Sequence, residues 1–211
     1  MDSDLSAAKP RRDSAATRGR LLVAATDEFA ARGIAGARVD RIASAARANK
    51  RLIYDYFTDK DGLFDAVMDA ITGQVTDAVP IDATDLPGYA GRLFDYVLDH
   101  PEVMRLAVWA RLEGRLGPTA RGKSTQIYWL RLTAIEAAQQ DGHVTTRLTP
   151  AQILMLIESL SVGWLATTPV FLAASDHDAA GHDHPQPLPG NAGSLNQARA
   201  VIIDSVRRLI T

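Results

Sequence analysis

Apolar residues recur at intervals of three and four along almost the whole chain, which is the pattern of helices with one buried face. An apolar stripe that includes Phe29 marks the first helix, which we expect to begin near Ser14 or Thr17. We expect it to end at Gly33, because glycine readily takes the left-handed conformation at a helix end. No segment alternates convincingly with a period of two, so the predicted fold is all-α.

Two short helices joined by a turn are predicted over residues 38–60. Ile42 and Ala46 lie on one face of the first, and Ile53 and Phe57 lie four residues apart on one face of the second. The residues left to point outward are Lys50, Arg51, Tyr54 and Lys60. Two helices at a fixed angle, the second with cations and phenols on its outer side, are typical of proteins whose second helix enters the major groove of DNA.

Beyond residue 60 the pattern predicts a larger helical part. One helix begins after a cap at Thr58 or Asp59, another ends at His100, and the next begins at Pro101. Further helices cover 119–140 and 194–210, and between these two a helix begins at Pro150 with Thr149 as its N-cap. Residues 174–193 are rich in Ala, Asp, Pro and Gly, and their few apolar side chains cannot offset the entropy lost on ordering. We therefore expect a mobile loop there.

Charge divides the chain in the same way. Residues 1–60 hold twelve Lys and Arg against eight Asp and Glu, a net of +4, and residues 61–211 have a net of −6. Exposed cations at one end favour binding to phosphate, since they release counterions from DNA. Ordinary scatter of surface charge is the alternative.

Composition excludes several other classes. The chain has no cysteine, so disulfides and thiolate metal sites are excluded. No apolar run approaches the length of a membrane helix, and the first residues lack the apolar core of a secretory signal, so we expect a cytoplasmic protein. Residues 1–13 are predicted to be a disordered basic tail, in which Arg11 and Arg12 could instead contact a minor groove or phosphate.

The run NKRLIYDYFTDKDGLF, from Asn49 to Phe64, resembles the recognition-helix signature of the tetracycline-repressor-like (TetR) transcriptional regulators. Upstream, TRGRLLVAATDEFAARGIAGARVDRIASAA resembles the first and second helices of that family, and the match spans roughly residues 17–68. The resemblance implies a three-helix DNA-binding domain with a helix-turn-helix over 14–60. It also implies a larger effector-binding and dimerisation domain over 61–211.

The residues expected to contact DNA lie around the second short helix. They are Arg38, Asn49, Lys50, Arg51, Leu52, Tyr54, Tyr56 and Lys60. Arg51 is suited to bidentate bonds with guanine, and Lys60 resembles a phosphate contact of the family. Partial burial for Tyr54, or mere solvation for Lys50 and Arg51, are the plainer alternatives.

Three positions depart from the family pattern. Arg47 stands where a glycine usually makes the turn, and a left-handed conformation there costs a non-glycine residue about 1 kcal/mol. Asp55 stands where an aromatic or basic residue is usual, and could accept from cytosine or pair with Lys50 or Arg51. Leu52 replaces a common threonine, so a hydroxyl contact to phosphate is lost. These departures concern sequence preference and not DNA binding itself.

The larger domain is expected to bind a small apolar or aromatic effector, because its aromatic residues are accompanied by a few polar groups. The candidate lining is Tyr96, His100, Arg105, Trp109, Glu113, Tyr128, Trp129 and Trp164. The alternative is that aromatic residues at helical spacing form the core.

A homodimer is also expected, since the helix from Pro150 is apolar on most of its circumference and the last helix carries an apolar stripe. The candidate interface is Ile153, Leu156, Ile157, Leu160, Trp164, Leu195, Ala198, Ile202 and Leu209.

Our interpretation is a DNA-binding transcriptional regulator, a repressor released from its operator by a small molecule. No cofactor and no catalytic constellation are expected. Two alternatives stay open: a DNA-binding protein without an effector, and a metal-responsive regulator. The latter would use His177, His182 and His184 with Asp176, Asp178 and Asp183, although a flexible segment gives such ligands no fixed geometry.

Overall fold

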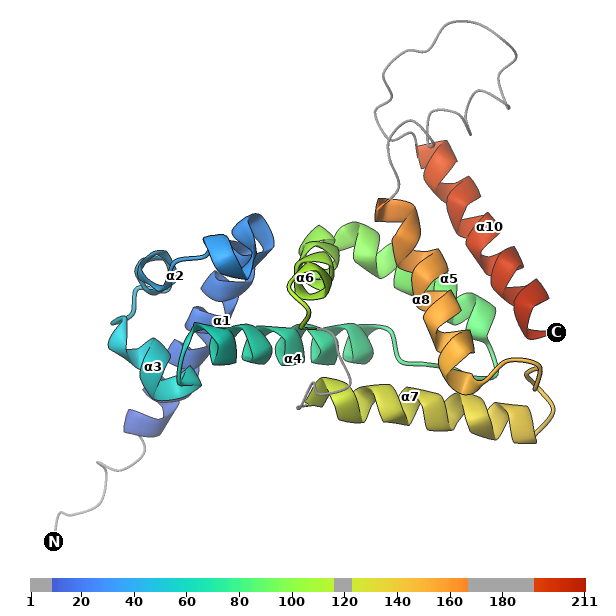
Figure 1. Ribbon diagram of the computed structural model, residues 1–211, viewed down its shortest axis with the longest axis horizontal. Helices are drawn as coiled ribbons and strands as arrows, with labels where there is room; N and C mark the ends of the chain where they lie inside the picture. The colour runs from blue at the N-terminus through green and yellow to red at the C-terminus, as the bar shows by residue number, and fades with distance from the viewer. Residues whose placement is uncertain (1–8, 116–122, 167–191) are drawn as a thin grey trace, which may run out of the picture. The chain divides into compact units, whose positions relative to one another are not determined.

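The computed structural model describes residues 9–115, 123–166 and 192–211, with side chains over 14–115, 125–163 and 195–211. These residues form nine α-helices, and none of them is in a strand (Figure 1). The helices are α1 (Lys9–Gly36), α2 (Val39–Ala45), α3 (Arg51–Phe57), α4 (Lys60–Ala78), α5 (Leu86–Asp99), α6 (Pro101–Leu112), α7 (Lys123–Gln140), α8 (Pro150–Ala166) and α10 (Ala192–Ile210). The prediction of an all-α fold is confirmed for this part of the chain.

Helix α1 begins earlier than its apolar stripe indicated. It starts at Lys9, so residues 9–13 of the expected disordered tail are helical, and residues 1–8 lie outside the described part. Pro10 suits this position, because the N–H groups in the first turn of a helix have no acceptor within the helix, so the N–H that proline lacks is not missed. Gly33 interrupts the helix with φ 66° and ψ 178°, a conformation nearly restricted to glycine.

Other helix ends follow their sequence signals. His100 is the C-cap of α5, as expected. At the start of α8 the Gln152 backbone N–H donates to Thr149 Oγ1 at 3.3 Å, and the Thr149 backbone N–H donates to Gln152 Oε1 at 2.9 Å. This reciprocal pair is a capping box. Helix α10 begins at Ala192, and the remainder of the expected mobile loop lies outside the described residues.

The chain divides into two compact units. Unit 1 comprises residues 1–74 and 101–125, and unit 2 comprises residues 75–100 and 126–211. The expected boundary between residues 60 and 61 therefore falls inside unit 1, which also includes most of α4 and all of α6. Tertiary packing causes this difference, because α6 packs against α1 although more than sixty residues separate them.

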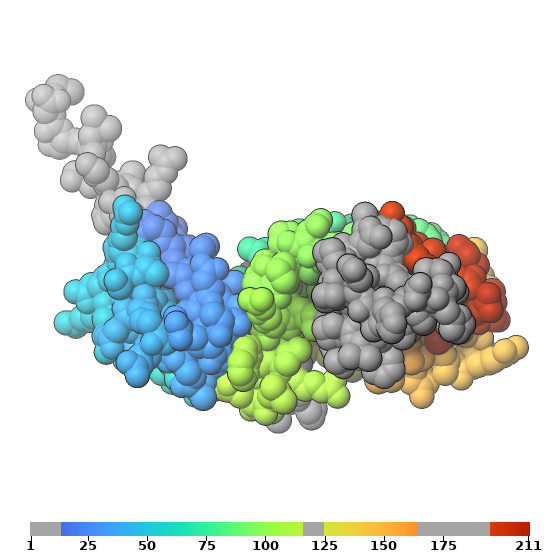
Figure 2. Space-filling model, turned by 90° about the horizontal axis from the view of Figure 1, so that it is seen from above, coloured from blue at the N-terminus to red at the C-terminus, as the bar shows by residue number. Residues whose placement is uncertain are grey.

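Unit 1 has a small core between α1, α2, α3, α4 and α6. Its fully buried side chains include Leu21, Phe29, Ile42, Ile53, Leu63, Phe64 and Leu106. The rings of Phe29 and Phe64 meet edge to face with centroids 5.2 Å apart. The side chains of α1, α2 and α3, dark to light blue in Figure 2, form one continuous surface. Because Ile53 and Phe57 are buried in this core, they fix the rotation of α3 about its axis.

In unit 2, α5 packs against both α8 and α10. The fully buried side chains of unit 2 include Leu86, Tyr89, Phe94, Ile135, Ile153, Leu154 and Ile157. Among the described helices, none is long and apolar enough to cross a membrane.

Candidate nucleic-acid interface

Helix α3 is amphipathic and presents its polar side outward. Ile53 is fully buried and Phe57 is 5% exposed, so these two residues hold the helix on the core of unit 1. Arg51 has 85% of its side-chain surface exposed, and Tyr54 is 46% exposed. The burial of two residues four positions apart thus leaves a cation and a phenol on the opposite face, where a helix must carry them to reach the edges of bases.

The turn that sets α3 against α2 contains a strained residue. Arg47 has φ 50°, in the left-handed region that the sequence predicted for this position. Its backbone N–H donates to Ser44 O at 3.1 Å, and the next N–H, that of Ala48, donates to Ala43 O at 2.9 Å. A left-handed residue closes these two bonds at the end of α2, which is why glycine would be favoured there.

Both cations at the start of α3 lie near carboxylates. Lys50 Nζ is 2.8 Å from Asp40 Oδ1, and this hydrogen-bonded carboxylate raises the pKa of the ammonium above its ordinary value. Arg51 Nε is 4.0 Å from Asp55 Oδ1, one helical turn away. Of the pairings considered for Asp55, the structure therefore has the one with Arg51. The pairing of Lys50 with Asp40 was not anticipated from sequence.

The other expected DNA-contact residues around α3 differ in their surroundings. Asn49 Oδ1 accepts from the Arg51 backbone N–H at 2.8 Å, so its amide caps α3. Leu52 is half-buried. Tyr56 is also half-buried, and its hydroxyl shares a hydrogen bond of 3.0 Å with Ser14 Oγ on α1.

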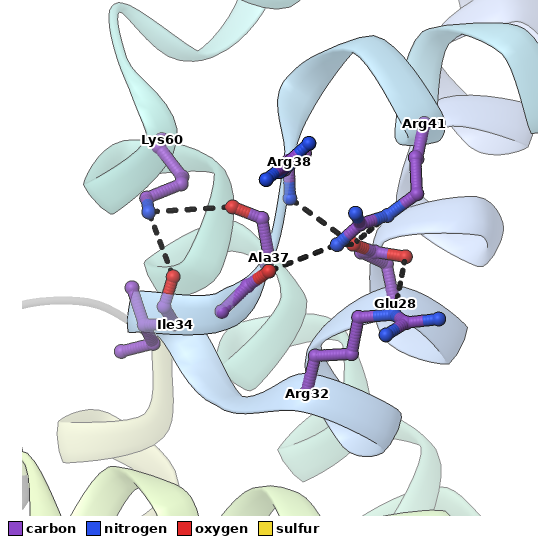
Figure 3. Close-up of polar contacts among 8 residues, drawn as sticks. Glu28, Arg32, Ile34, Ala37, Arg38, Arg41 and Lys60 are labelled. Atoms are coloured by element: carbon purple, nitrogen blue, oxygen red, sulfur yellow. Dashed lines mark hydrogen bonds and ion pairs between the residues drawn. The ribbon is translucent and has the colours of Figure 1, made fainter.

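Arg38 and Lys60 lie at the junction of α1 with α2 and α4 (Figure 3). Arg38 is exposed and is the N-cap of α2, where its side chain makes no capping hydrogen bond. Glu28 makes a different contact at this helix start, because its Oε1 accepts from the backbone N–H of the N-cap residue Arg38 itself at 3.0 Å. Lys60 Nζ donates to Ile34 O at 2.7 Å and to Ala37 O at 3.5 Å, so two of its three donors are committed to the protein. Its phosphate contact stays a prediction.

Glu28 gathers several donors at this junction. Its Oε1 also accepts from Arg41 Nε at 2.7 Å and from Arg41 Nη2, while Arg32 Nε lies 3.6 Å from its Oε2 (Figure 3). Only 12% of the Glu28 side chain is exposed. The hydrogen bonds from Arg41 hold the pKa of this carboxyl below its ordinary value. The glutamate therefore ties α1 to the start of α2.

Two further contacts join α1 to the helix pair, and no motif had indicated them. The Arg18 guanidinium lies over the ring of Phe57, 5.0 Å from its centroid. Arg20 Nε donates to Ala46 O, the last carbonyl of the α2 end, at 3.2 Å. Arg18 and Arg20 lie two residues apart on α1, and the sequence gave no signal for their contacts. Both contacts depend on where α2 and α3 pack against α1.

Comparisons with known proteins assign this arrangement. Residues 21–67 match the family of bacterial regulatory proteins named tetR, and residues 85–208 match the tetracyclin repressor-like C-terminal domain. The chain belongs to the TetR family. It is a helix-turn-helix transcriptional regulator that binds DNA through its amino-terminal helices, and the family is one of regulators and not of enzymes.

Individual relatives agree with this assignment. The HTH-type transcriptional repressor SCO4008 of Streptomyces coelicolor is 37% identical over 159 residues, which cover 75% of this chain and 82% of that protein. The repressor NicS of Pseudomonas putida is 29% identical over 68% of this chain and 73% of its own. The crystal structure of SCO4942, also from Streptomyces coelicolor, has a TM-score of 0.71 and 34% identity, covering 92% of this chain and 98% of its own.

The candidate effector residues of this TetR regulator are divided between its two units. Arg105, Trp109 and Glu113 belong to unit 1, whereas Tyr96, His100, Tyr128, Trp129 and Trp164 belong to unit 2. On α7, Tyr128 is 38% exposed and Trp129 is 62% exposed, and the Trp164 side chain lies outside the described residues. The effector lining expected from sequence stays a prediction.

Trp109 and Glu113 have an evident task within unit 1. An ideal Cβ on Gly33 would lie 2.8 Å from the Trp109 ring, so the indole rests directly on the glycine backbone. Glu113 Oε1 accepts from the Ile34 backbone N–H at 3.0 Å. Both residues therefore fasten α6 to the end of α1.

The expected dimer residues also fall into two sets. Ile153, Ile157, Ala198 and Ile202 are at most 1% exposed within one chain, so they belong to the core of the protomer and are not available to a partner. This corrects the interpretation of the apolar circumference of α8, which the protomer itself covers in part. Leu156, Leu160, Leu195 and Leu209 are half-buried. The exposed apolar residues of these helices are Met155 and Val201, which had not been singled out.

The metal alternative rested on His177, His182, His184 and the neighbouring aspartates, all of which lie outside the described residues. Within the described part, no group of three or more His, Asp and Glu side chains is placed to hold a metal ion.

Proposed function

We propose that this protein is a homodimeric repressor whose α3 helices enter successive major grooves of a roughly palindromic operator, and which a small-molecule effector releases. The outward part of α3 carries the proposal: Arg51 and Tyr54 are exposed on the helix whose Ile53 and Phe57 are buried. The names of SCO4008 and NicS, both transcriptional repressors, support the negative sign of regulation.

The dimer would form on the exposed sides of α8 and α10. Met155 is 55% exposed, and next to it the half-buried Leu156 and Leu160, four residues apart, share one side of α8. On α10, Val201 is 47% exposed beside the buried Ile202. Val201→Asp would place a charge in the interface and shift the protein toward monomers in sedimentation, whereas Ile202→Asp would unfold the protomer. A wild-type protein that sediments as a monomer at micromolar concentration contradicts the dimer.

Release by an effector requires two states of the dimer with different affinities for both ligands. Operator DNA must then weaken effector binding by the same factor by which the effector weakens operator binding. Titration of the operator complex with metabolites, measured in both directions, tests this reciprocity.

One experiment tests the DNA interface most directly: sequencing of the genomic fragments that the purified protein retains. Arg51→Ala should relax base preference at one position in each half-site, at about 1–3 kcal/mol. Arg105→Ala, an exposed arginine on α6, is the matched control and should retain the sequence preference of the wild type. An Arg51→Ala protein with unchanged affinity and base preference would show that α3 does not read the operator.

A further inference from the structure

A polar cluster lies in the otherwise apolar interior of unit 2. Arg131 on α7 is only 8% exposed. Its Nη2 donates to Thr76 Oγ1 on α4 at 2.9 Å, and its Nη1 donates to Glu158 Oε1 on α8 at 3.3 Å. Three helices that are distant in sequence thus meet at one guanidinium.

Two buried atoms at this cluster are left without hydrogen bonds. Among the residues that the structure describes, neither Arg131 Nε nor the hydroxyl of Tyr89 on α5 has a partner. Tyr89 is fully buried. A buried donor without an acceptor is costly and rare in folded proteins, so each of these two atoms calls for an acceptor that the described residues do not supply.

Tyr89 and Arg131 are electrostatic neighbours. Burial raises the pKa of the Tyr89 phenol, while the positive charge of Arg131 opposes this rise and the carboxylate of Glu158 adds to it. The phenol is therefore neutral at physiological pH and offers its O–H. Together with Arg131 Nε–H it supplies two donors from two helices, α5 and α7.

We propose that Tyr89 and Arg131 anchor the effector, and that this effector is a neutral, largely apolar molecule with a carbonyl-type oxygen that accepts from both. The inference rests on the proposed release by an effector and names the chemical class and the residues of that response. It differs from the aromatic lining expected from sequence, in which neither residue appeared.

The charges of the cluster decide the class of ligand. Glu158 already faces the Arg131 cation with its carboxyl group at 3.3 Å, and burial raises the pKa of this carboxyl while Arg131 opposes the rise. A ligand carboxylate would leave a net negative charge in an apolar interior, which is unfavourable, whereas a neutral acceptor adds no charge. The remaining surroundings favour an apolar body, since the fully buried residues of these helices include Leu86, Ile135, Leu154 and Ile157. Glu158 keeps 42% of its side chain exposed, so the cluster extends from the interior to the surface.

The test compares three series of probes with the full-length protein: aliphatic and aromatic methyl ketones, hydrocarbons of the same carbon skeletons, and the corresponding carboxylates. Thermal shift and isothermal titration measure binding, and operator release is measured in parallel. We expect ketones to bind the wild type at least tenfold more tightly than the matched hydrocarbons and carboxylates.

Two variants address the two donors separately. Tyr89→Phe deletes the unpaired hydroxyl, and Arg131→Lys keeps the cation that faces Glu158 but has no Nε–H. Each should weaken ketone binding at least tenfold. Ser161→Ala is the control, because the Ser161 hydroxyl is buried but already donates to Ala90 O at 3.0 Å. It should lower thermal stability while leaving ketone affinity within twofold of the wild type.

Each outcome is decisive. Equal binding of hydrocarbons, tighter binding of carboxylates, no binding in any series, or unchanged ketone affinity in Tyr89→Phe would overturn the proposal. Ketones that bind through Tyr89 and Arg131 but leave the operator complex intact would confirm the site and contradict the effector response. Release of the operator by a compound that binds Tyr89→Phe as tightly as the wild type would preserve the response and refute the anchor.

Discussion

In unit 1 the polar groups at helix ends are paired across elements, whereas in unit 2 two buried side chains, those of Tyr89 and Arg131, each keep one unpaired atom among the described residues. Glu28 accepts from the backbone of Arg38, Glu113 accepts from that of Ile34, and Lys60 donates to Ile34 O. In unit 2, by contrast, Arg131 Nε and the Tyr89 hydroxyl have no partner among the described residues. Pairing at the helix ends holds α3 at a fixed angle, whereas the unpaired donors of unit 2 are available to an effector of the class proposed above.

The largest expected effect comes from Gly33→Ala, which attacks the most constrained point of unit 1. The backbone there has φ 66° and ψ 178°, and a Cβ would lie 2.8 Å from the Trp109 ring. Strain and overpacking together should lower the free energy of unfolding by about 3 kcal/mol or more. Gly19→Ala is the control: no atom lies within 4 Å of its ideal Cβ, and alanine in a helix should add up to about 1 kcal/mol. Similar stability of the two variants in urea would contradict the assigned role of Gly33.

Removal of the Glu28 charge should have the next largest effect. Glu28→Gln weakens charge-assisted bonds from Arg41 and should cost about 1–3 kcal/mol in urea unfolding. Because the folded-state pKa of Glu28 is lowered, its contribution is complete above the ordinary glutamate value of about 4.3 and is lost as pH falls through the lower folded pKa. The difference between wild type and Glu28→Gln should therefore shrink on acidification below that value. Glu136→Gln, an exposed site on α7, should show neither effect.

In unit 2 the removal of two buried hydroxyls should act with opposite signs. Ser161→Ala breaks a bond to Ala90 O and should cost about 1 kcal/mol. Tyr89→Phe removes an unpaired hydroxyl and should leave the stability unchanged or raise it slightly in the absence of ligand. Thermal unfolding of the two variants beside wild type measures the contrast. A destabilised Tyr89→Phe would mean that the phenol is bonded in solution, and would remove the contrast between the units.

The turn between α2 and α3 holds a residue other than glycine, Arg47, in the left-handed conformation. Arg47→Gly should relieve the left-handed conformation at φ 50° and stabilise the protein by up to about 1 kcal/mol. Arg47→Ala removes the same charge without relieving the backbone. A stability of Arg47→Gly no greater than that of Arg47→Ala would indicate that the turn is not strained.

The smallest expected effect concerns the carboxylate beside Lys50. Asp40→Asn frees the ammonium 2.8 Å away and removes a negative charge close to the DNA-binding face. Affinity for all DNA sequences should rise by a few fold at low salt, and the gain should fade as salt increases. Asp99→Asn, an exposed change at the end of α5 in unit 2, gives the same net charge and should leave DNA affinity nearly unchanged. Equal gains from both variants would attribute the effect to net charge alone.

Local sequence alone determined the helices, several of their ends and the DNA-binding motif. The spacing of Ile53 and Phe57 defined the buried side of α3, and Thr149 with Pro150 located the start of α8, because such signals act within one or two helical turns. Tertiary structure decided which surfaces remain free. Only packing revealed that α6 belongs with α1, that Ile202 is covered by its own protomer, and that Lys50 faces Asp40. The unpaired donors of Tyr89 and Arg131 were also decided by tertiary structure. Whether a buried polar atom is paired depends on which residues of other helices pack against it, and the periodicity of one chain segment does not contain this information.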